Sequence, residues 1–174
     1  VLAGEAENLA RFDVMAGGVV EDRAPIIILG GGRVGRVVAR EIEARGLDYR
    51  IVDVNPDRKT RASDPDKVVV GSASDLATLE RAGIRVTPTV VVTTHDDATN
   101  VYLTIYCRKL REDVQIVARA NLDRNVSTLH RAGANLVMSY TSLGASTILG
   151  LTDSRSALHI AECLELFRCV VPMS

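Results

Sequence analysis

The sequence predicts an α/β fold with a Rossmann-type, doubly wound, parallel six-stranded sheet. An apolar run at 26–29 leads directly into a glycine turn and then into a stretch with helical spacing. Short apolar runs then alternate with helical patterns as far as residue 138. Hydrophobic content is 47% and aromatic content only 3%. A core of Val, Ile, Leu and Ala suits parallel strands that are buried on both faces.

The glycine turn has the G-x-G-x-x-G spacing of a dinucleotide-binding loop, with Gly30, Gly32 and Gly35 in the glycine places. Gly30 lets the chain turn sharply off the strand, Gly32 lets backbone approach a pyrophosphate, and Gly35 lets the helix pack closely on the sheet. The helix that follows points free N–H groups at the phosphates. A purely structural turn is the alternative.

The remaining elements follow in order. The helix after the loop is expected at 34–44, where Gly46 ends it, and the second strand at 49–54. Asn55-Pro56 forces a turn into a short helix at 57–62. Further strands are expected at 67–70, 89–93, 115–118 and 136–138, and further helices at 75–82, 97–110 and 124–131. Right-handed crossovers then predict the strand order 3-2-1-4-5-6.

Two segments flank this unit of residues 25–138. Residues 1–24 are expected to form an N-terminal linker or arm with a short amphipathic helix. Residues 139–165 are expected to form a helix pair, with helices at 143–151 and 156–164. Because the sheet is already complete, this apolar pair is expected to bury itself against a second subunit. Folding back on its own sheet is the alternative. The chain reads as part of something longer.

Composition excludes several classes of protein. The net charge of −1 and the pI near 6.3 give no basic footprint for nucleic acid. No stretch has the length and apolarity of a bilayer-spanning segment, and no signal peptide is evident. The three cysteines lack C-x-x-C spacing, so reduced thiols of a cytosolic protein are expected. No catalytic set is recognisable, and we expect a protein that is not an enzyme.

The expected carboxyl edge of the sheet carries the candidate contacts. Asp53 ends the second strand, where its carboxylate can accept ribose hydroxyls and repel a 2′-phosphate, which favours NAD or an adenine nucleotide over NADP. A strand-end cap is the alternative for Asp53. Arg33 either grips a phosphate or faces solvent. Ser72 to Asp75 and Thr93 to Asp97 offer polar groups to a ligand, although helix caps at Ser74 or Asp75 and at Thr94 or Asp96 explain them as well. Asn100 is expected to face the same edge.

Six motifs in this order resemble the RCK family (regulator of K⁺ conductance, also called KTN or TrkA-N). They are Ile-Ile-Ile-Leu-Gly-Gly-Gly-Arg-Val-Gly at 26–35, Ile-Val-Asp-Val-Asn-Pro at 51–56, Val-Val-Gly-Ser-Ala-Ser-Asp at 69–75, Thr-Thr-His-Asp-Asp-Ala-Thr-Asn at 93–100, Ala-Arg-Ala at 118–120 and Ala-Gly-Ala-Asn-Leu-Val at 132–137. The resemblance implies that residues within these motifs contact a bound NAD(H) or adenine nucleotide (ADP, ATP or AMP). The candidate contacts are Gly30, Gly31, Gly32, Arg33, Val34, Gly35, Asp53, Val54, Asn55, Ser72, Ala73, Thr93, Thr94, His95, Asn100 and Arg119.

The resemblance implies a cytoplasmic gating domain at the face of the cell membrane. It implies a homodimer through crossover helices at 139–165, an octameric gating ring, and the start of a C-terminal lobe at 166–174. It also implies a divalent cation such as Ca²⁺ in some members, for which no ligands are identified here. Two positions depart from the family pattern. Ser72 stands where many members have an acidic residue, so the family's partner for base or ribose at that place does not carry over to this chain. Ser139-Tyr140 stands in place of Pro-Glu and, together with the 24-residue lead before the first strand, favours a domain fused behind a K⁺ channel pore in the same polypeptide.

Three alternatives remain at this point. The first is a soluble Trk/Ktr-type subunit or the tail of a K⁺/H⁺ antiporter. The second is a fragment of an NAD-dependent oxidoreductase. The third is a dimerisation module whose glycine loop binds nothing.

Overall fold

A computed structural model describes residues 24–60, 64–139 and Ala145 of the chain. The chain divides into two compact units, Val1–Met138 and Ser139–Ser174, and the first contains nearly everything that the structure describes. The expected arm at 1–24 falls almost wholly outside the described residues. The crossover helices, apart from Ala145, and the segment 166–174 also lie outside them.

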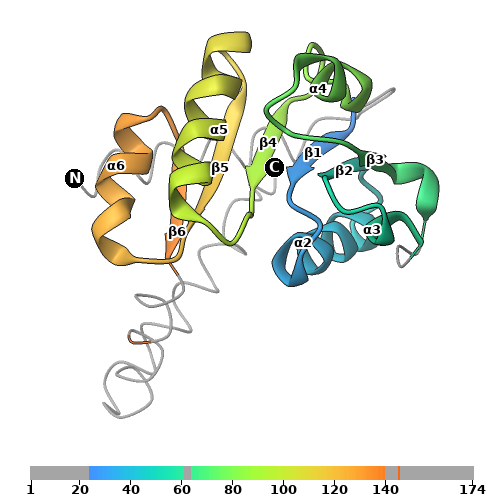
Figure 1. Cartoon of the computed structure of the whole chain (residues 1–174), viewed down its shortest axis with the longest axis horizontal. Helices are drawn as coiled ribbons and strands as arrows, with labels where there is room; N and C mark the ends of the chain where they lie inside the picture. Colours follow the sequence, from blue (N-terminus) through green and yellow to red (C-terminus); the bar gives the residue numbers. More distant parts are fainter. Residues whose placement is uncertain (1–23, 61–63, 140–144, 146–174) are drawn as a thin grey trace, which may run out of the picture. The chain divides into compact units, whose positions relative to one another are not determined.

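The expected six-stranded sheet is confirmed (Figure 1). Its order is β3-β2-β1-β4-β5-β6, as the right-handed crossovers predict. The ladders β1·β2, β1·β4, β2·β3 and β4·β5 are parallel, and Ile28 pairs with Ile51 on one side and with Val91 on the other. The strands are β1 (Ile26–Leu29), β2 (Tyr49–Asp53), β3 (Val68–Val70), β4 (Thr89–Val92), β5 (Gln115–Ala120) and β6 (Leu136–Ser139).

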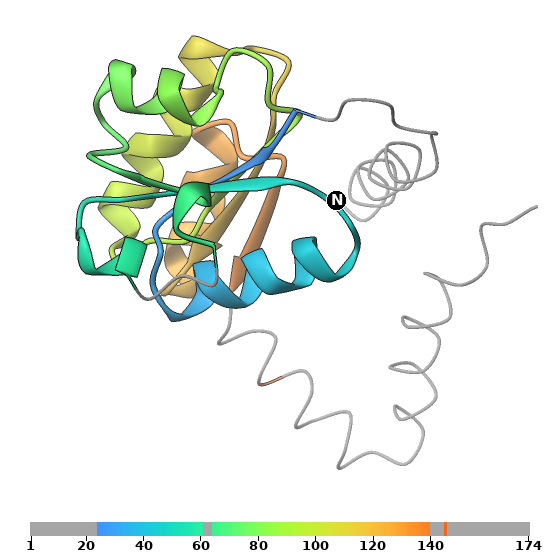
Figure 2. The same cartoon turned by 90° about the vertical axis from the view of Figure 1, so that its right-hand side faces the viewer.

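Helices cover both faces of the sheet (Figure 2). They are α2 (Arg33–Ala44), α3 (Asp57–Thr60), α4 (Leu76–Ala82), α5 (Asp97–Leu110) and α6 (Val126–Arg131), with short 3₁₀ turns η1 (Pro65–Lys67) and η2 (Asp123–Asn125). Successive residues of β1 point to opposite faces. Ile27 and Leu29 join a core that includes residues of α4, α5 and α6, whereas Ile28 packs in a second core with Ala39 of α2.

Several boundaries differ from the sequence-based expectations. Strand β5 runs two residues further than expected, to Ala120, which is buried like Ile116, Val117 and Ala118. The helix expected at 124–131 begins as the 3₁₀ turn η2 and becomes α-helical at Val126. The turn η1 was not expected; it begins where the Asp64 side chain accepts a hydrogen bond from the backbone N–H of Asp66. Helix and strand ends are the part of a fold that local patterns define least.

Candidate functional site

A cleft of about 1130 Å³ lies where the carboxyl ends of β1, β2, β3 and β4 meet the loops that follow them. This is the position at which doubly wound sheets bind ligands, since the strand order reverses there between β1 and β4. Thirteen of the sixteen candidate residues line it: Gly30, Gly32, Arg33, Val34, Asp53, Val54, Asn55, Ser72, Ala73, Thr93, Thr94, His95 and Arg119. The other three, Gly31, Gly35 and Asn100, do not.

The three motif glycines have different surroundings. Gly30 has φ +107°, a left-handed conformation that side chains rarely adopt, and a Cβ there would lie 3.2 Å from the backbone of Thr93. A Cβ on Gly35 would overlap the carbonyl oxygen of Gly30. Around Gly32, by contrast, a Cβ would meet nothing within 4 Å, and its φ is −68°. The described fold therefore requires glycine at the first and third places, and space is left open at the second.

Thr93 holds the glycine loop against β4. Its hydroxyl donates to the carbonyl oxygens of Gly30 at 3.0 Å and of Leu29 at 3.2 Å, and its side chain is buried. The backbone N–H of Thr93 also donates to Leu29. Thr93 therefore fixes the position of the glycine loop, and its hydroxyl hydrogen is already used in these hydrogen bonds to the backbone.

Asp53 ties the loop to the end of β2. Its Oδ2 accepts a hydrogen bond from the N–H of Gly31 at 2.7 Å, and its Oδ1 accepts from the N–H of Asn55 at 2.8 Å. The side chain is 13% exposed. Each carboxylate oxygen keeps a second lone pair. Asp53 can therefore support the loop and still accept a hydrogen bond from a ligand hydroxyl in the cleft, as its sequence position predicts. Its hydrogen bond to the glycine loop is what the structure adds.

The two expected helix caps are confirmed on either side of the cleft. The Asp75 carboxylate accepts from the backbone N–H of Thr78 at 3.1 Å, and the Asp96 carboxylate accepts from that of Thr99 at 2.7 Å. The pKa of each carboxyl is lowered, mainly by a hydrogen bond from a threonine hydroxyl: that of Thr78 to Asp75 and that of Thr99 to Asp96. Both caps stay ionised at neutral pH and fix the start of α4 and α5.

Asn100 lies behind the cleft wall and is fully buried. Its Nδ2 donates to the carbonyl oxygens of Thr94 at 3.2 Å and Arg119 at 2.9 Å, and its Oδ1 accepts from the Thr94 hydroxyl at 2.6 Å. Asn100 thus joins the loop after β4 to the end of β5. Its place in the structure is that of a residue that positions two cleft residues from behind.

The structure adds Arg58 and Tyr102 to the residues that line the cleft. Arg58 lies on α3, and its Nε is 3.7 Å from Oδ2 of Asp53. Tyr102 is 50% exposed and follows Ala98 by one helical turn on the cleft side of α5. The Asn55-Pro56 turn could have indicated Arg58, because it aims the start of the next helix at the same edge.

These features fit an adenine nucleotide. At about 1130 Å³ the cleft is slightly larger than most small-molecule sites, which have volumes of roughly 300–1,000 Å³. It combines an open glycine loop, a carboxylate at the end of β2 and three arginines, Arg33, Arg58 and Arg119. The start of α2 has no side-chain cap and no acidic residue in its first turn, which leaves its dipole free to attract phosphate.

Within the described ranges, no group of three or more His, Cys, Asp or Glu side chains could hold a metal ion. No described helix has the length and apolarity to cross a bilayer.

Known proteins with similar sequences include potassium channel and potassium uptake proteins. The chain is 30% identical over 148 residues to the probable potassium channel protein 2 of Methanocaldococcus jannaschii, covering 83% of this chain and 43% of that protein. It is 32% identical over 125 residues to the Trk system potassium uptake protein TrkA of Mycobacterium tuberculosis, covering 71% and 57% respectively. The chain therefore spans only about half the length of these relatives.

Solved structures of similar domains contain nucleotides. The GsuK channel bound to NAD superposes with a TM-score of 0.70 at 35% identity, over 84% of this chain and 26% of that one. GsuK bound to ADP gives 0.66 at 36% identity, over 75% and 34%. The Kef CTD of Shewanella denitrificans in its AMP-bound form gives 0.67 at 26% identity, over 83% and 90%.

The family model described as the TrkA-N domain matches residues 26–140, which include the whole sheet and every residue that lines the cleft. With the relatives above, this match shows that the chain belongs to the TrkA-N, or RCK, domain family.

Proposed function

We propose that this domain is the cytoplasmic ligand-sensing part of a prokaryotic K⁺ channel and that it binds an adenine nucleotide or dinucleotide in the cleft. The observation that carries the proposal is the open space at Gly32, beside a carboxylate held at the end of β2. In this reading the N–H groups at the start of α2 and Arg33 hold phosphate, and Asp53 holds a ribose. The ADP, NAD and AMP complexes of similar structures support it.

We also propose how the bound nucleotide acts on the channel. The domain senses the nucleotide without transforming it, pairs with a second copy through the helices of 139–165, and joins an octameric ring below a pore in the same polypeptide. A ligand shifts such a ring only by its difference in affinity for two conformations, typically about 1–3 kcal/mol per site. The relationship to a potassium channel protein and a potassium uptake protein supports a role in potassium transport.

Titration of the chain with NADH, ADP and AMP tests the proposal. We expect saturable binding, and at 100 times the Kd a ligand adds about 2.7 kcal/mol to the free energy of unfolding. Asp53→Asn should weaken binding about tenfold, because a charge-assisted hydrogen bond to the ribose is lost. The matched control is Asp66→Asn, an exposed carboxylate in η1 outside the cleft, which should bind as the parent does.

Two results would contradict the proposal. Absence of binding for all three nucleotides would remove its basis. Oxidation of NADH by the chain with a small carbonyl substrate, followed at the nicotinamide absorbance, would favour an oxidoreductase over a sensor.

A further inference from the structure

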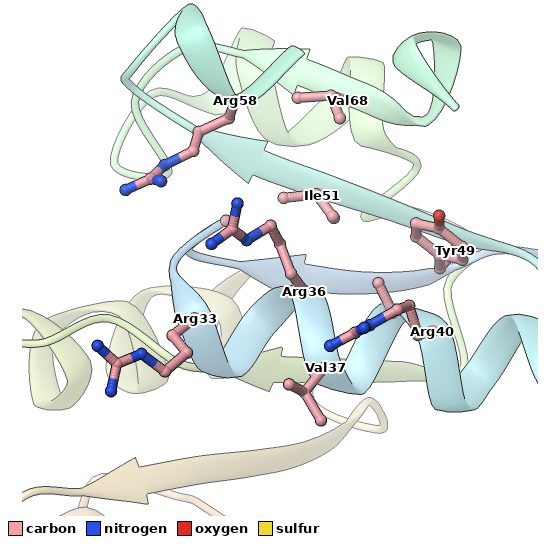
Figure 3. Close-up of a pocket in the computed structure, with 10 residues that line it drawn as sticks. Arg33, Arg36, Val37, Arg40, Tyr49, Ile51, Arg58 and Val68 are labelled. Carbon is pink, nitrogen blue, oxygen red and sulfur yellow. The ribbon is translucent and has the colours of Figure 1, made fainter. Parts of the chain in front are cut away.

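A second cavity of about 350 Å³ lies beside the glycine loop, between α2 and the strands β2 and β3 (Figure 3). Its floor is apolar and includes Tyr49, Ile51 and Val68. Its rim carries four arginines, which we call the arginine pocket: Arg33, Arg36 and Arg40 from α2, and Arg58 from α3. In Figure 3, Arg36 extends from α2 toward the side of the pocket where Arg58 lies.

The arginine pocket has an excess of positive charge. The spacing of three and four residues places Arg33, Arg36 and Arg40 on one face of α2, where like charges repel. Among the described residues no carboxylate pairs with these three, whereas Arg45 of the same helical segment pairs with Glu41 at 2.8 Å. The Nε of Arg58 is buried without a hydrogen-bond partner in the described part of the chain. Such a site attracts an anion with more than one charge.

The arginine pocket adjoins the nucleotide cleft. Arg33 and Arg58 line both cavities, and Gly31, whose N–H donates to Asp53 Oδ2, lines the arginine pocket. In this fold, a carboxylate at the end of the second strand accepts a hydrogen bond from the 2′-hydroxyl of an adenosine ribose. A phosphate attached to that 2′ oxygen would therefore lie beside Asp53, at the entrance to the arginine pocket.

We propose that the arginine pocket receives the 2′-phosphate of NADP(H), so that this domain binds NADPH as well as NADH. The inference rests on the proposed nucleotide site. It runs against the expectation that Asp53 alone would reject a 2′-phosphate. The Asp53 carboxylate accepts two backbone N–H groups and lies 3.7 Å from Arg58, so its single charge already has a guanidinium partner, and the adjoining arginine pocket carries three more guanidinium groups. Guanidinium forks match phosphate oxygens, and a nearby arginine is how this fold accommodates a 2′-phosphate.

The test compares NADH with NADPH, which differ only by that phosphate, on the 174-residue chain. Isothermal titration should give Kd values for the two within about tenfold of each other. Arg36→Gln should weaken NADPH about tenfold or more, because a charge-assisted bond to phosphate is lost, and leave NADH within about twofold. Arg40→Gln should act in the same direction. Arg45→Gln, on the same segment but outside both cavities, should change neither affinity.

The results of these titrations distinguish a failure of the NADPH inference from a failure of the proposed nucleotide site. Tight NADH binding with NADPH weaker by about a hundredfold or more would overturn the inference and leave the proposed function intact. Unchanged NADPH affinity in the Arg36→Gln, Arg40→Gln double variant would also overturn it. Binding of neither dinucleotide, nor of ADP, would remove the proposed function and this inference with it. Preserved NADH binding in each variant shows that the variant is folded.

Discussion

Gly32 caps the start of α2 and Gly35 lies three residues further on in its first turn, but a methyl group would meet different surroundings at each. At Gly35 it would overlap the carbonyl oxygen of Gly30, which lies where α2 crosses the end of β1. At Gly32 it would extend into open space within the cleft. The first glycine is required by packing inside the protein, and the second is explained by the approach of a ligand to the backbone.

Alanine substitutions separate these two roles. Gly35→Ala should lower the free energy of unfolding by about 1–3 kcal/mol, because the added methyl forces α2 away from β1. Gly32→Ala should change it by less than about 0.5 kcal/mol yet weaken nucleotide binding. Urea unfolding and nucleotide titration of both variants measure this. Equal destabilisation by the two substitutions would contradict the described loop geometry.

At the scale of elements, Asp97 at the start of α5 joins the loop after β4 to the loop after β5. Its Oδ1 accepts from the backbone N–H and Nδ2 of Asn121, and its Oδ2 accepts from the N–H of Leu122 and from Nδ2 of Asn125. The Nδ2 of Asn121 also donates to the carbonyl oxygen of His95 at 2.9 Å. Asp97 thus fixes the loop after β5 against the loop after β4, which forms one wall of the cleft.

The same carboxylate predicts a dependence of stability on pH. Burial raises the pKa of Asp97, but hydrogen bonds from Asn125, Asn121 and Leu122 outweigh this, so the pKa is lowered in the folded state. A lowered pKa stabilises the fold fully above the unfolded value of about 3.9, and this stabilisation is lost as pH falls through the folded value.

Asp97→Asn should cost about 1–3 kcal/mol at pH 7, because its amide NH₂ would face donors. The difference from the parent should shrink as pH falls below about 4. Urea unfolding at pH 7, 5, 4 and 3 measures it, with Asp66→Asn as an exposed control. A difference that stays constant down to pH 3 would contradict the role of the ionised carboxylate.

At the scale of the whole molecule, Cys107 reports on the integrity of the larger core. It lies on α5, is fully buried among residues from both halves of the sheet, and burial raises its pKa to about 12 despite the nearby Arg108. Because the thiolate is the reactive form, iodoacetamide should reach Cys107 only through unfolding.

Alkylation of the peptide that contains Cys107, followed by mass spectrometry, should therefore be at least about a hundredfold slower in native buffer than in urea. Saturating nucleotide should slow it further, since binding stabilises the folded state. Reaction at the same rate in buffer and in urea would show that α5 is not packed on the sheet as described.

Local patterns were sufficient for the architecture and for most of the cleft. The glycine spacing, the aspartate at the end of the second strand and the regular alternation of strands and helices are all local signals, and the handedness of crossovers converts them into one strand order. Once the order is known, every loop at the carboxyl edge must converge on one crevice. Thirteen candidate residues lie in the cleft for this reason.

What only the tertiary structure decided is how side chains distant in sequence meet. Asn100 turned out to lie behind the wall because the ends of β4 and β5 offer it two carbonyl oxygens there. Thr93 holds the glycine loop from 63 residues away. The sequence spacing places three arginines on one face of α2, but only the packing of the chain brings Arg58 beside them around one pocket. Sequence determines which edge of a parallel sheet binds, whereas the packing of helices on that sheet determines which charges gather beside it.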